Sequence, residues 1–390
     1  MSEENNNNQM GGQKPATVEL RSEGLELGGG KKPINKKMAG IIIGVIALLI
    51  IVGLGVYAAM RQTAGSTDVS GQDKGIFGDL PQAGEKDKEP ATESGFSGMP
   101  CDHAERRAIG VMLAGDPVNR PLSGASKADM MWELPVLASN VTRLMGVYQC
   151  GEPTEIGSVR SARHDYLFLA EGLDAILAHW GGSYHALNRI AVGEFQTLNA
   201  LVNPDNAFFR KNDLPAPYNG FTSYDRLWKA LQALGYRTTS NFHGYDFKDD
   251  ASSDQRPAGG TLTVSWPGQF RVSYEYDPVT NRYVRYWAGV KQVDAEDNQV
   301  VAPSAVVVVR ATNGPMTGPG GYNDVGIEGS GEMEVYQDGA VIKGTWRKNE
   351  LEKKDPTHFL DENGKPVVFT RGQVWVMAPS ADVPVTWTVQ

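Results

Sequence analysis

Residues Ile156 to Ser183 read IGSVRSARHDYLFLAEGLDAILAHWGGS, and polar residues there stand among apolar runs. We expect a helix over ARHDYLFLAEGL, with Ser161 as its N-cap, because a serine hydroxyl can accept a backbone N–H of the first turn. Gly172 would then end this helix. The next segment, AILAHW, is a short apolar run typical of a buried strand. The stretch therefore predicts a helix and a strand of an α/β domain.

The arginines of this stretch lie where an anion would be favoured. Arg160 comes just before the expected helix and Arg163 in its first turn, close to unpaired backbone N–H groups. Two guanidinium groups can grip a carboxylate or a phosphate in fork geometry. The strand is followed by Gly181-Gly182-Ser183, and ligands of open α/β sheets bind at the carboxyl ends of strands. The sequence thus predicts an anion-binding surface.

The same residues also have an ordinary structural interpretation. The arginines would then form internal salt bridges with Glu133, Asp165 or Glu171, and His179 would be a hydrogen-bonded core histidine. The density of polar residues around two glycines favours a site for the set as a whole. A later stretch, FFR followed by PYNG, can line a groove with SVRSAR through its aromatic and arginine side chains. The ligand-binding candidates are Arg160, Arg163, His164, Gly181, Gly182, Ser183, Arg210 and Tyr218.

The composition is that of a globular protein with an acidic balance. The chain has 390 residues, is 41% hydrophobic and carries a formal net charge of -9. This length favours two domains. An acidic body gives no support for nucleic-acid binding, which needs a basic patch or stripe.

The N-terminal hundred residues predict a membrane anchor. Residues 1–38 are polar and rich in Asn and Gly, which indicates a disordered tail. Residues 39–60 contain the uncharged run AGIIIGVIALLIIVGLGVYAA, long enough for a helix to cross a bilayer. Lysines precede this run, so the positive-inside rule leaves the N-terminus in the cytoplasm and the body outside. Residues 61–103 are rich in Gly, Ser and Pro and indicate a flexible spacer.

Two other interpretations of the apolar run have weaker support. A lipid anchor would need a cysteine at the end of the run, and the first cysteine of the chain is Cys101. Val56-Tyr57-Ala58 could serve as a signal-peptidase site, but the run is longer than an ordinary signal-peptide core. We therefore expect a single-pass, uncleaved anchor with the folded domains outside the cell membrane.

The chain contains two cysteines, Cys101 and Cys150, both on the expected outer side. An even count in an oxidising compartment indicates a disulfide, here closing a loop of about 50 residues and worth about 4 kcal/mol on the loop-entropy model. Metal ligation by Cys101 with His103, or two free thiols, are the alternatives. Two residues fall short of a four-ligand site, so we expect no metal and no cofactor.

The hydrophobic pattern divides the remaining chain into two domains. Residues 104–246 show apolar runs and helical stripes that predict an α/β domain. Residues 247–258 are a polar linker, and residues 259–390 alternate in a way that predicts a mostly-β, antiparallel domain. Tight hairpin connections are expected at Asp277–Asn281, Asp338-Gly339 and Asn363-Gly364.

Several local expectations complete this pattern. Ser123 and Ser126 stand near a possible helix start. One helix is expected within SYHALNRIAVGEFQTLNAL, and another within YDRLWKALQAL, where Thr222 or Ser223 provides the cap. The Gly-rich segment 314–326 is expected to be a flexible loop, because it lacks the strand-to-helix context of a phosphate-binding loop.

Five segments in the same order resemble the N-terminal domain of the YerB-like family of bacterial envelope proteins. They are VNRPLSGASKADMMWEL, TRLMGVYQ, IGSVRSAR, HWGGS and FFR with PYNGFTSYDRL, and the pair SVRSAR and HWGGS is the most specific. The resemblance covers nearly all of residues 105–390. It implies an α/β domain followed by a β-rich domain on the outer face of the membrane, and it implies no activity. This chain departs from the lipoprotein members in its anchor.

Local signatures of catalysis are missing from the sequence: it contains no H-E-x-x-H, G-x-S-x-G, C-x-x-C or Walker sequence. A carboxylate mechanism stays open if Glu133 and Asp165 lie within roughly 5–10 Å of each other, and His179 is a further acid/base candidate. The sequence therefore leaves two functional hypotheses. The first is a membrane-anchored module that binds a cell-wall polymer or an envelope protein through residues 156–183. The alternative is an enzyme acting on peptidoglycan or another envelope glycan.

Overall fold

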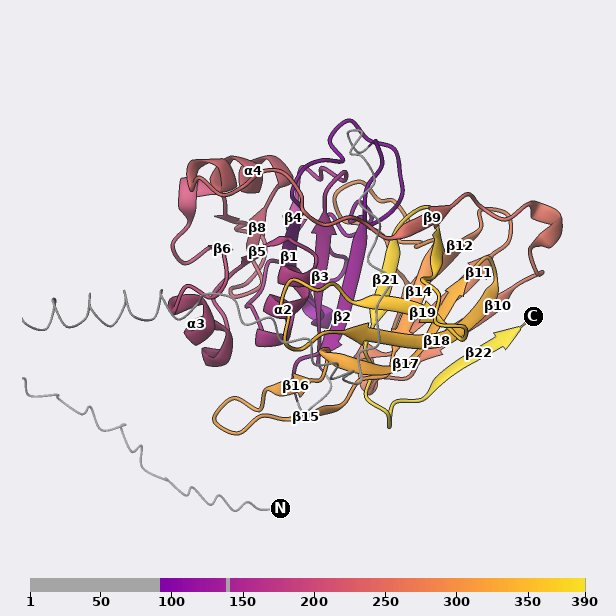
Figure 1. The fold of residues 1–390 in the computed structure, drawn as a ribbon. Helices are drawn as coiled ribbons and strands as arrows, with labels where there is room; N and C mark the ends of the chain where they lie inside the picture. Colours follow the sequence, from indigo (N-terminus) through magenta and orange to yellow (C-terminus); the bar gives the residue numbers. More distant parts are fainter. Residues whose placement is uncertain (1–91, 138–140, 390) are drawn as a thin grey trace, which may run out of the picture. The chain divides into compact units, whose positions relative to one another are not determined.

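The computed structural model describes residues 92–137 and 141–389 (Figure 1). The expected cytoplasmic tail, the expected membrane-spanning helix and residues 61–91 of the expected spacer lie outside the described residues. Within the described ranges, no helix has the length and apolar character that crossing a membrane requires.

The described chain is mostly β-structure with a few helices. Its first half contains β1 (Ile109–Ala114), β2 (Met130–Pro135), β3 (Thr142–Tyr148), β4 (Ile156–Gly157), α2 (His164–Gly172), β5 (Ile176–His179), α3 (Tyr184–Ala191), β6 (Thr197–Asn199), β7 (Phe209–Arg210), β8 (Gly220–Thr222), α4 (Tyr224–Ala233) and β9 (Asp246–Lys248). Its second half contains β10 (Gly260–Val264), β11 (Val272–Asp277), β12 (Arg282–Trp287), β13 (Val290–Lys291), β14 (Ala305–Val309), β15 (Asn313–Pro315), β16 (Asn323–Val325), β17 (Gly329–Gln337), β18 (Ala340–Lys348), β19 (His358–Asp361), β20 (Val368–Thr370), β21 (Val374–Met377) and β22 (Val385–Val389). Short 3₁₀ helices occupy Pro117–Asn119, Pro204–Asn206, Ser253–Gln255 and Gly268–Phe270.

One ten-stranded sheet runs through both halves of the sequence (Figure 1). Its strand order is β19-β18-β17-β14-β21-β2-β3-β1-β5-β6. The halves meet where β21 pairs in parallel with β2, from Met130 opposite Val374 to Glu133 opposite Met377. The strands at this junction are fully buried, as expected of largely apolar strands, and Glu133 of β2 is the one charged residue among them.

The strand directions differ in part from the antiparallel arrangement expected after residue 259. β21 is parallel to both β14 and β2, whereas β17 is antiparallel to β14 and to β18. A second sheet, ordered β13-β12-β11-β10-β22, is antiparallel throughout and shows the expected alternation of buried and less buried residues. The hairpin connections expected at Asp277–Asn281 and Asp338-Gly339 are confirmed.

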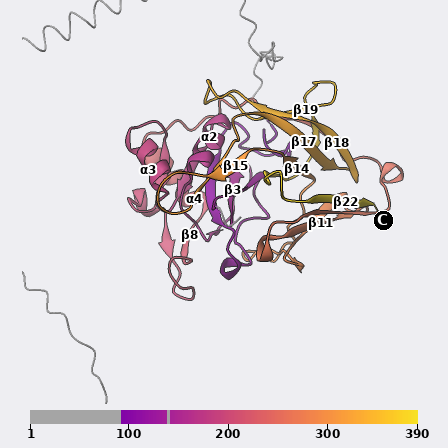
Figure 2. The same ribbon diagram turned by 90° about the horizontal axis from the view of Figure 1, so that it is seen from below.

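The ten-stranded sheet is covered on both faces. The buried helix α2 packs on one face through Leu167 and Leu169, together with Ala186 of α3. Leu227 and Leu231 of α4 pack on the other face, and the five-stranded sheet covers the same face farther along. Figure 2 shows β11 and β22 of that sheet in a layer separate from β17 and β18. The helices thus cover the end of the large sheet built from the first half of the sequence.

Local structure corrects two expectations about helix starts. Ser161 does not cap α2: the helix begins at His164, and Arg163 is its N-cap without a capping side-chain bond. No helix begins at Ser123 or Ser126. The backbone N–H of Ser126 donates instead to the carboxylate of Asp294, at 2.7 Å, so the segment is fixed as a loop before the buried strand β2.

Other local expectations are confirmed or refined. Ser223 caps α4 by accepting from the backbone N–H of Arg226, and Ser183 caps α3 in the same way. The segment 314–326, expected to be a loop, contributes to the hairpin of β15 and β16, in which Asn313 pairs with Val325.

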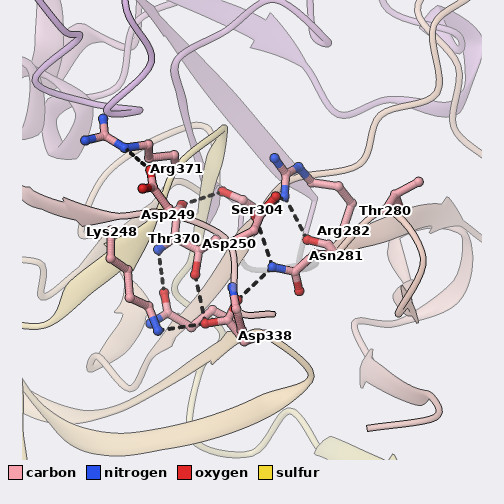
Figure 3. Close-up of polar contacts among 12 residues, drawn as sticks. Lys248, Asp249, Asp250, Thr280, Asn281, Arg282, Ser304, Asp338, Thr370 and Arg371 are labelled. Carbon is pink, nitrogen blue, oxygen red and sulfur yellow. Dashed lines mark hydrogen bonds and ion pairs between the residues drawn. The ribbon is translucent and has the colours of Figure 1, made fainter. Parts of the chain in front are cut away.

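A polar network fixes the segment around β9 to the second half of the chain (Figure 3). The carboxylate of Asp338 accepts from the side chains of Asn281, at 2.7 Å, and Thr370, at 3.0 Å, and it pairs with Lys248 at 2.7 Å. The Asn281 amide also donates to Asp250. Every buried carboxylate oxygen of Asp338 therefore has a partner, which is what a structural network requires.

Candidate functional site

The segments SVRSAR and HWGGS lie side by side. The backbone N–H of Trp180 donates to the carbonyl of Arg160 at 3.0 Å, and Ala162 and Gly181 are joined by a 2.9 Å hydrogen bond. The N–H of Ser183 in turn donates to the carbonyl of Ala162. Because β5 carries HWGGS at its carboxyl end, both arginines of SVRSAR are placed at that end of the sheet.

Arg160 is held by an aromatic ring and a backbone carbonyl. Its guanidinium lies over the ring of Tyr218, 4.7 Å from the centroid, and one Nη donates to the carbonyl of Pro217 at 3.0 Å. Arg163 is held in a similar way, by the carbonyl of Ala162 at 2.9 Å and by the ring of Tyr322 at 4.9 Å. These contacts orient the guanidinium groups without neutralising their charge.

The internal salt bridges considered for these arginines do not form. Within the described residues, neither Arg160 nor Arg163 is paired with a carboxylate. Glu133 instead forms an ion pair with Arg285 at 2.7 Å, and both of these side chains are fully buried. Among the described residues, neither guanidinium therefore has a directly paired carboxylate, and Asp165 acts on Arg163 only at longer range.

Arg143 of β3 is a third arginine near Arg160 and Arg163, and it was not among the residues predicted from the sequence. It is buried, and its nearest carboxylate oxygen, on Asp116, is 3.9 Å from Nη1. Burial and the neighbouring guanidinium of Arg163, together with that of Arg160, lower the pKa of Arg143 to about 9, although Asp116 opposes this shift. A charged residue inside the apolar run VTRLMGVYQ was the available signal. We call Arg143, Arg160 and Arg163 the arginine cluster.

The other aromatic and arginine candidates border the cluster. Arg210 is exposed and lies over the ring of Trp180, 4.2 Å from the centroid, and it donates to the side chain of Asn219 at 2.6 Å. Tyr218, from the same loop, carries Arg160 on its ring. The structure therefore brings together the arginines of SVRSAR and the FFR and PYNG segments.

The glycines and polar residues of HWGGS have structural tasks. His179 is fully buried, and its Nδ1 lies 2.7 Å from the carbonyl of Gly181. Burial lowers the pKa of His179 to about 4, so the ring is neutral at pH 7. Gly181 has a φ of +64°, a left-handed conformation that favours glycine. Ser183 is used as the α3 cap, and Gly182 packs against Leu187.

His164 and Asp165 form a second polar group with a residue from the second half of the chain. The Nε2 of His164 lies 2.9 Å from Oδ1 of Asp165 and 3.0 Å from Oδ1 of Asp324. Asp324 belongs to β16, within the segment expected to be a loop. Sequence spacing could not indicate this meeting, because Asp165 and Asp324 come from separate halves of the chain.

The acid/base candidates are not brought together on an open surface. Glu133 is enclosed by Arg285, by the Thr142 hydroxyl at 3.0 Å and by the Trp375 indole N–H at 3.2 Å. His179 is equally buried. This arrangement does not favour attack on a polymeric glycan by either group.

Cys101 and Cys150 form a disulfide, with Cα atoms 5.9 Å apart and 49 residues apart in sequence. Cys150 follows the end of β3 that is remote from Arg143 along the strand. The bond therefore anchors the segment before β1 and is separate from the arginine cluster.

Comparison with known proteins assigns the chain to a family. Residues 95–237 match the family model "Protein of unknown function (DUF3048) N-terminal domain", and residues 262–376 match the corresponding C-terminal domain. The chain belongs to this family, which is the YerB-like family whose segments it resembles.

Two comparisons with individual proteins agree with this assignment. The chain is 29% identical over 311 residues to "Putative lipoprotein YerB" of Bacillus subtilis (strain 168), covering 78% of this chain and 89% of that protein. The crystal structure of YerB protein from Bacillus subtilis matches with a TM-score of 0.67 at 26% identity, over 75% of this chain and 99% of that one.

Proposed function

We propose that this chain is a membrane-anchored envelope protein that binds an anionic group of a cell-wall polymer through the arginine cluster and the adjoining Arg210. The observation that carries the proposal is the missing counterion. Arg160 and Arg163 have no carboxylate partner among the described residues, and the carboxylate nearest to Arg143 is 3.9 Å away. A phosphodiester or carboxylate of a polymer would supply the charge that the protein does not.

The contacts of these arginines suit recognition rather than stability. Three buried Nε atoms, one from each member of the cluster, have no hydrogen-bond partner among the described residues. Clustering like charges in a buried place costs free energy, which binding of an anion would recover. The aromatic rings beneath Arg160, Arg163 and Arg210 keep the planar guanidinium groups oriented, so less ordering is needed on binding.

Three features support an extracytoplasmic, single-pass location with the N-terminus in the cytoplasm. The sequence of residues 39–60 has the length and composition of a membrane span, with lysines before it. The Cys101–Cys150 disulfide is typical of an oxidising compartment. The relative from Bacillus subtilis is named as a lipoprotein. Here a membrane helix would take the place of a lipid as the anchor.

The test uses the full-length chain in detergent and sedimentation with cell-wall sacculi. One batch of sacculi retains phosphate-bearing wall polymers, and a second has lost them through hydrofluoric acid. We expect the protein to sediment with the first batch, and Arg160→Gln to weaken binding about tenfold or more, since a hydrogen bond to a charged group contributes about 1.5–3 kcal/mol.

Arg271→Gln provides the matched control. Arg271 is exposed and lies outside the cluster, and its substitution removes the same charge. It should bind like the unmodified protein. Equal binding by Arg160→Gln and the unmodified protein, or no sedimentation with either batch, would refute the proposal. Soluble muropeptides in the supernatant would favour the enzymatic alternative instead.

A further inference from the structure

His164, Asp165 and Asp324 form a compact group of metal-ligand types. One nitrogen and two carboxylate oxygens, one from each residue, all lie within 4.8 Å of one another. Two ligands at about 2.1 Å from a metal ion, in perpendicular directions, are separated by about 3 Å. The distances from His164 Nε2 to the two carboxylate oxygens are 2.9 and 3.0 Å. The three atoms therefore lie within the span that ligands of one ion occupy, and without an ion the two short nitrogen–oxygen distances are those of hydrogen bonds.

One carboxylate of the group is nearly enclosed and only partly hydrogen-bonded. The side chain of Asp165 is 2% exposed, and its Oδ2 has no hydrogen-bond partner among the described residues. One imidazole faces two carboxylates, so even a protonated imidazole would leave one negative charge of the group without a partner. A divalent cation would balance this charge, and a buried unpaired carboxylate is otherwise costly.

The surroundings allow both entry and further ligation. The side chain of Asp324 is 66% exposed, so an ion can reach the group from solvent. The ring of His185 stands 5.9 Å from the ring of His164, between centroids, and its buried Nε2 has no partner within the described ranges. A second imidazole is thus present beside the three ligands.

We propose that His164, Asp165 and Asp324 bind a divalent transition-metal ion. One imidazole with two carboxylates suits zinc or manganese, and the open positions would be filled by water or by a ligand. Such an ion would join the start of α2 to β16, and so link the two halves of the chain beside Arg163. This inference does not depend on binding of a wall polymer.

The experiment measures Zn²⁺ binding to the full-length chain in detergent by calorimetry, after removal of metals by a chelator. Residues 1–91 and 138–140 contain no His or Cys, so no imidazole or thiol in these segments competes for the ion. We expect one Zn²⁺ per chain and a rise in melting temperature on binding. Asp324→Asn should raise the dissociation constant at least about tenfold, since even outer-shell changes at metal sites cost 10–100-fold.

Asp382→Asn is the matched control, because it removes an exposed carboxylate in the turn between β21 and β22. It should bind Zn²⁺ like the unmodified chain. The exposure of Asp324 means that its variant should fold, and the melting temperature without metal verifies this. The visible spectrum of the Co²⁺-loaded chain should change in Asp324→Asn and stay unchanged in Asp382→Asn. Absence of Zn²⁺ binding, or equal binding by Asp324→Asn, would overturn the proposal.

Discussion

Glu133 and Arg285 are fully buried and form an ion pair across the two halves of the sequence, at 2.7 Å. Removing one partner of a buried pair leaves the other charge uncompensated, which costs about 3–5 kcal/mol. We therefore expect Glu133→Gln to lower the free energy of unfolding by that amount in urea denaturation. The double variant Glu133→Gln, Arg285→Met should recover part of the loss. A loss below 1 kcal/mol would show that the pair contributes little.

The burial of His179 makes the free energy of unfolding depend on pH. Its folded pKa is about 4, against 6.5 for an ordinary histidine, because it is buried. Between these values the unfolded chain binds the proton more readily, so stability falls as the pH is lowered from 6.5 to 4. The contribution is about 3 kcal/mol at most. At pH 7 the folded histidine is neutral and the unfolded one mostly so, which leaves only a small effect.

The measurement compares urea unfolding of His179→Asn with that of the unmodified chain from pH 7 to pH 4.5. The amide of asparagine can still donate to the Gly181 carbonyl but does not titrate. Its unfolding free energy should decline less steeply with falling pH, whereas His243→Asn, at an exposed histidine, should keep the original slope. Parallel slopes for all three proteins would contradict the assignment.

At the scale of single residues, the sequence indicated that Arg160 and Arg163 lie near HWGGS, but it could not indicate the buried surroundings of Glu133. Arg160 and Arg163 were recognisable because they lie in a polar segment beside glycines. Glu133 looked like a catalytic carboxylate because its partner, Arg285, comes 152 residues later. Pairing over such a distance leaves no local pattern, and the same is true of Asp324 opposite His164.

At the scale of elements, periodicity predicted the strands better than the sheet they build. The apolar run of β1 and the alternation along β11 and β12 were recognised because side-chain direction repeats every two residues. Helix α4 was placed by its serine cap and apolar stripe. Every residue of helix α2 except Glu171 is buried, and the helix has no separate apolar stripe, so its start could not be fixed by such a stripe. The parallel pairing of β21 with β2 could not be predicted, since neither strand carries a signal for its neighbour.

At the scale of the whole described body, one sheet joins the two segments that the family models match separately. β21 lies between β14 and β2, and the Trp375 indole on β21 donates to Glu133 on β2. Arg285 on β12 reaches the same carboxylate from the five-stranded sheet. Elements that share their central strands and a buried ion pair should open together.

We therefore expect a single cooperative unfolding transition for residues 92–389 rather than two. Hydrogen exchange followed by mass spectrometry measures the opening free energy of peptides covering β1 and β11, one from each half. In the unmodified chain these two values should agree. Glu133→Gln should lower both by the same amount, because its carboxylate holds β2, β21 and β12 at once. If the variant accelerates exchange in β11 while β1 stays protected, the halves unfold independently, and the shared sheet does not couple them.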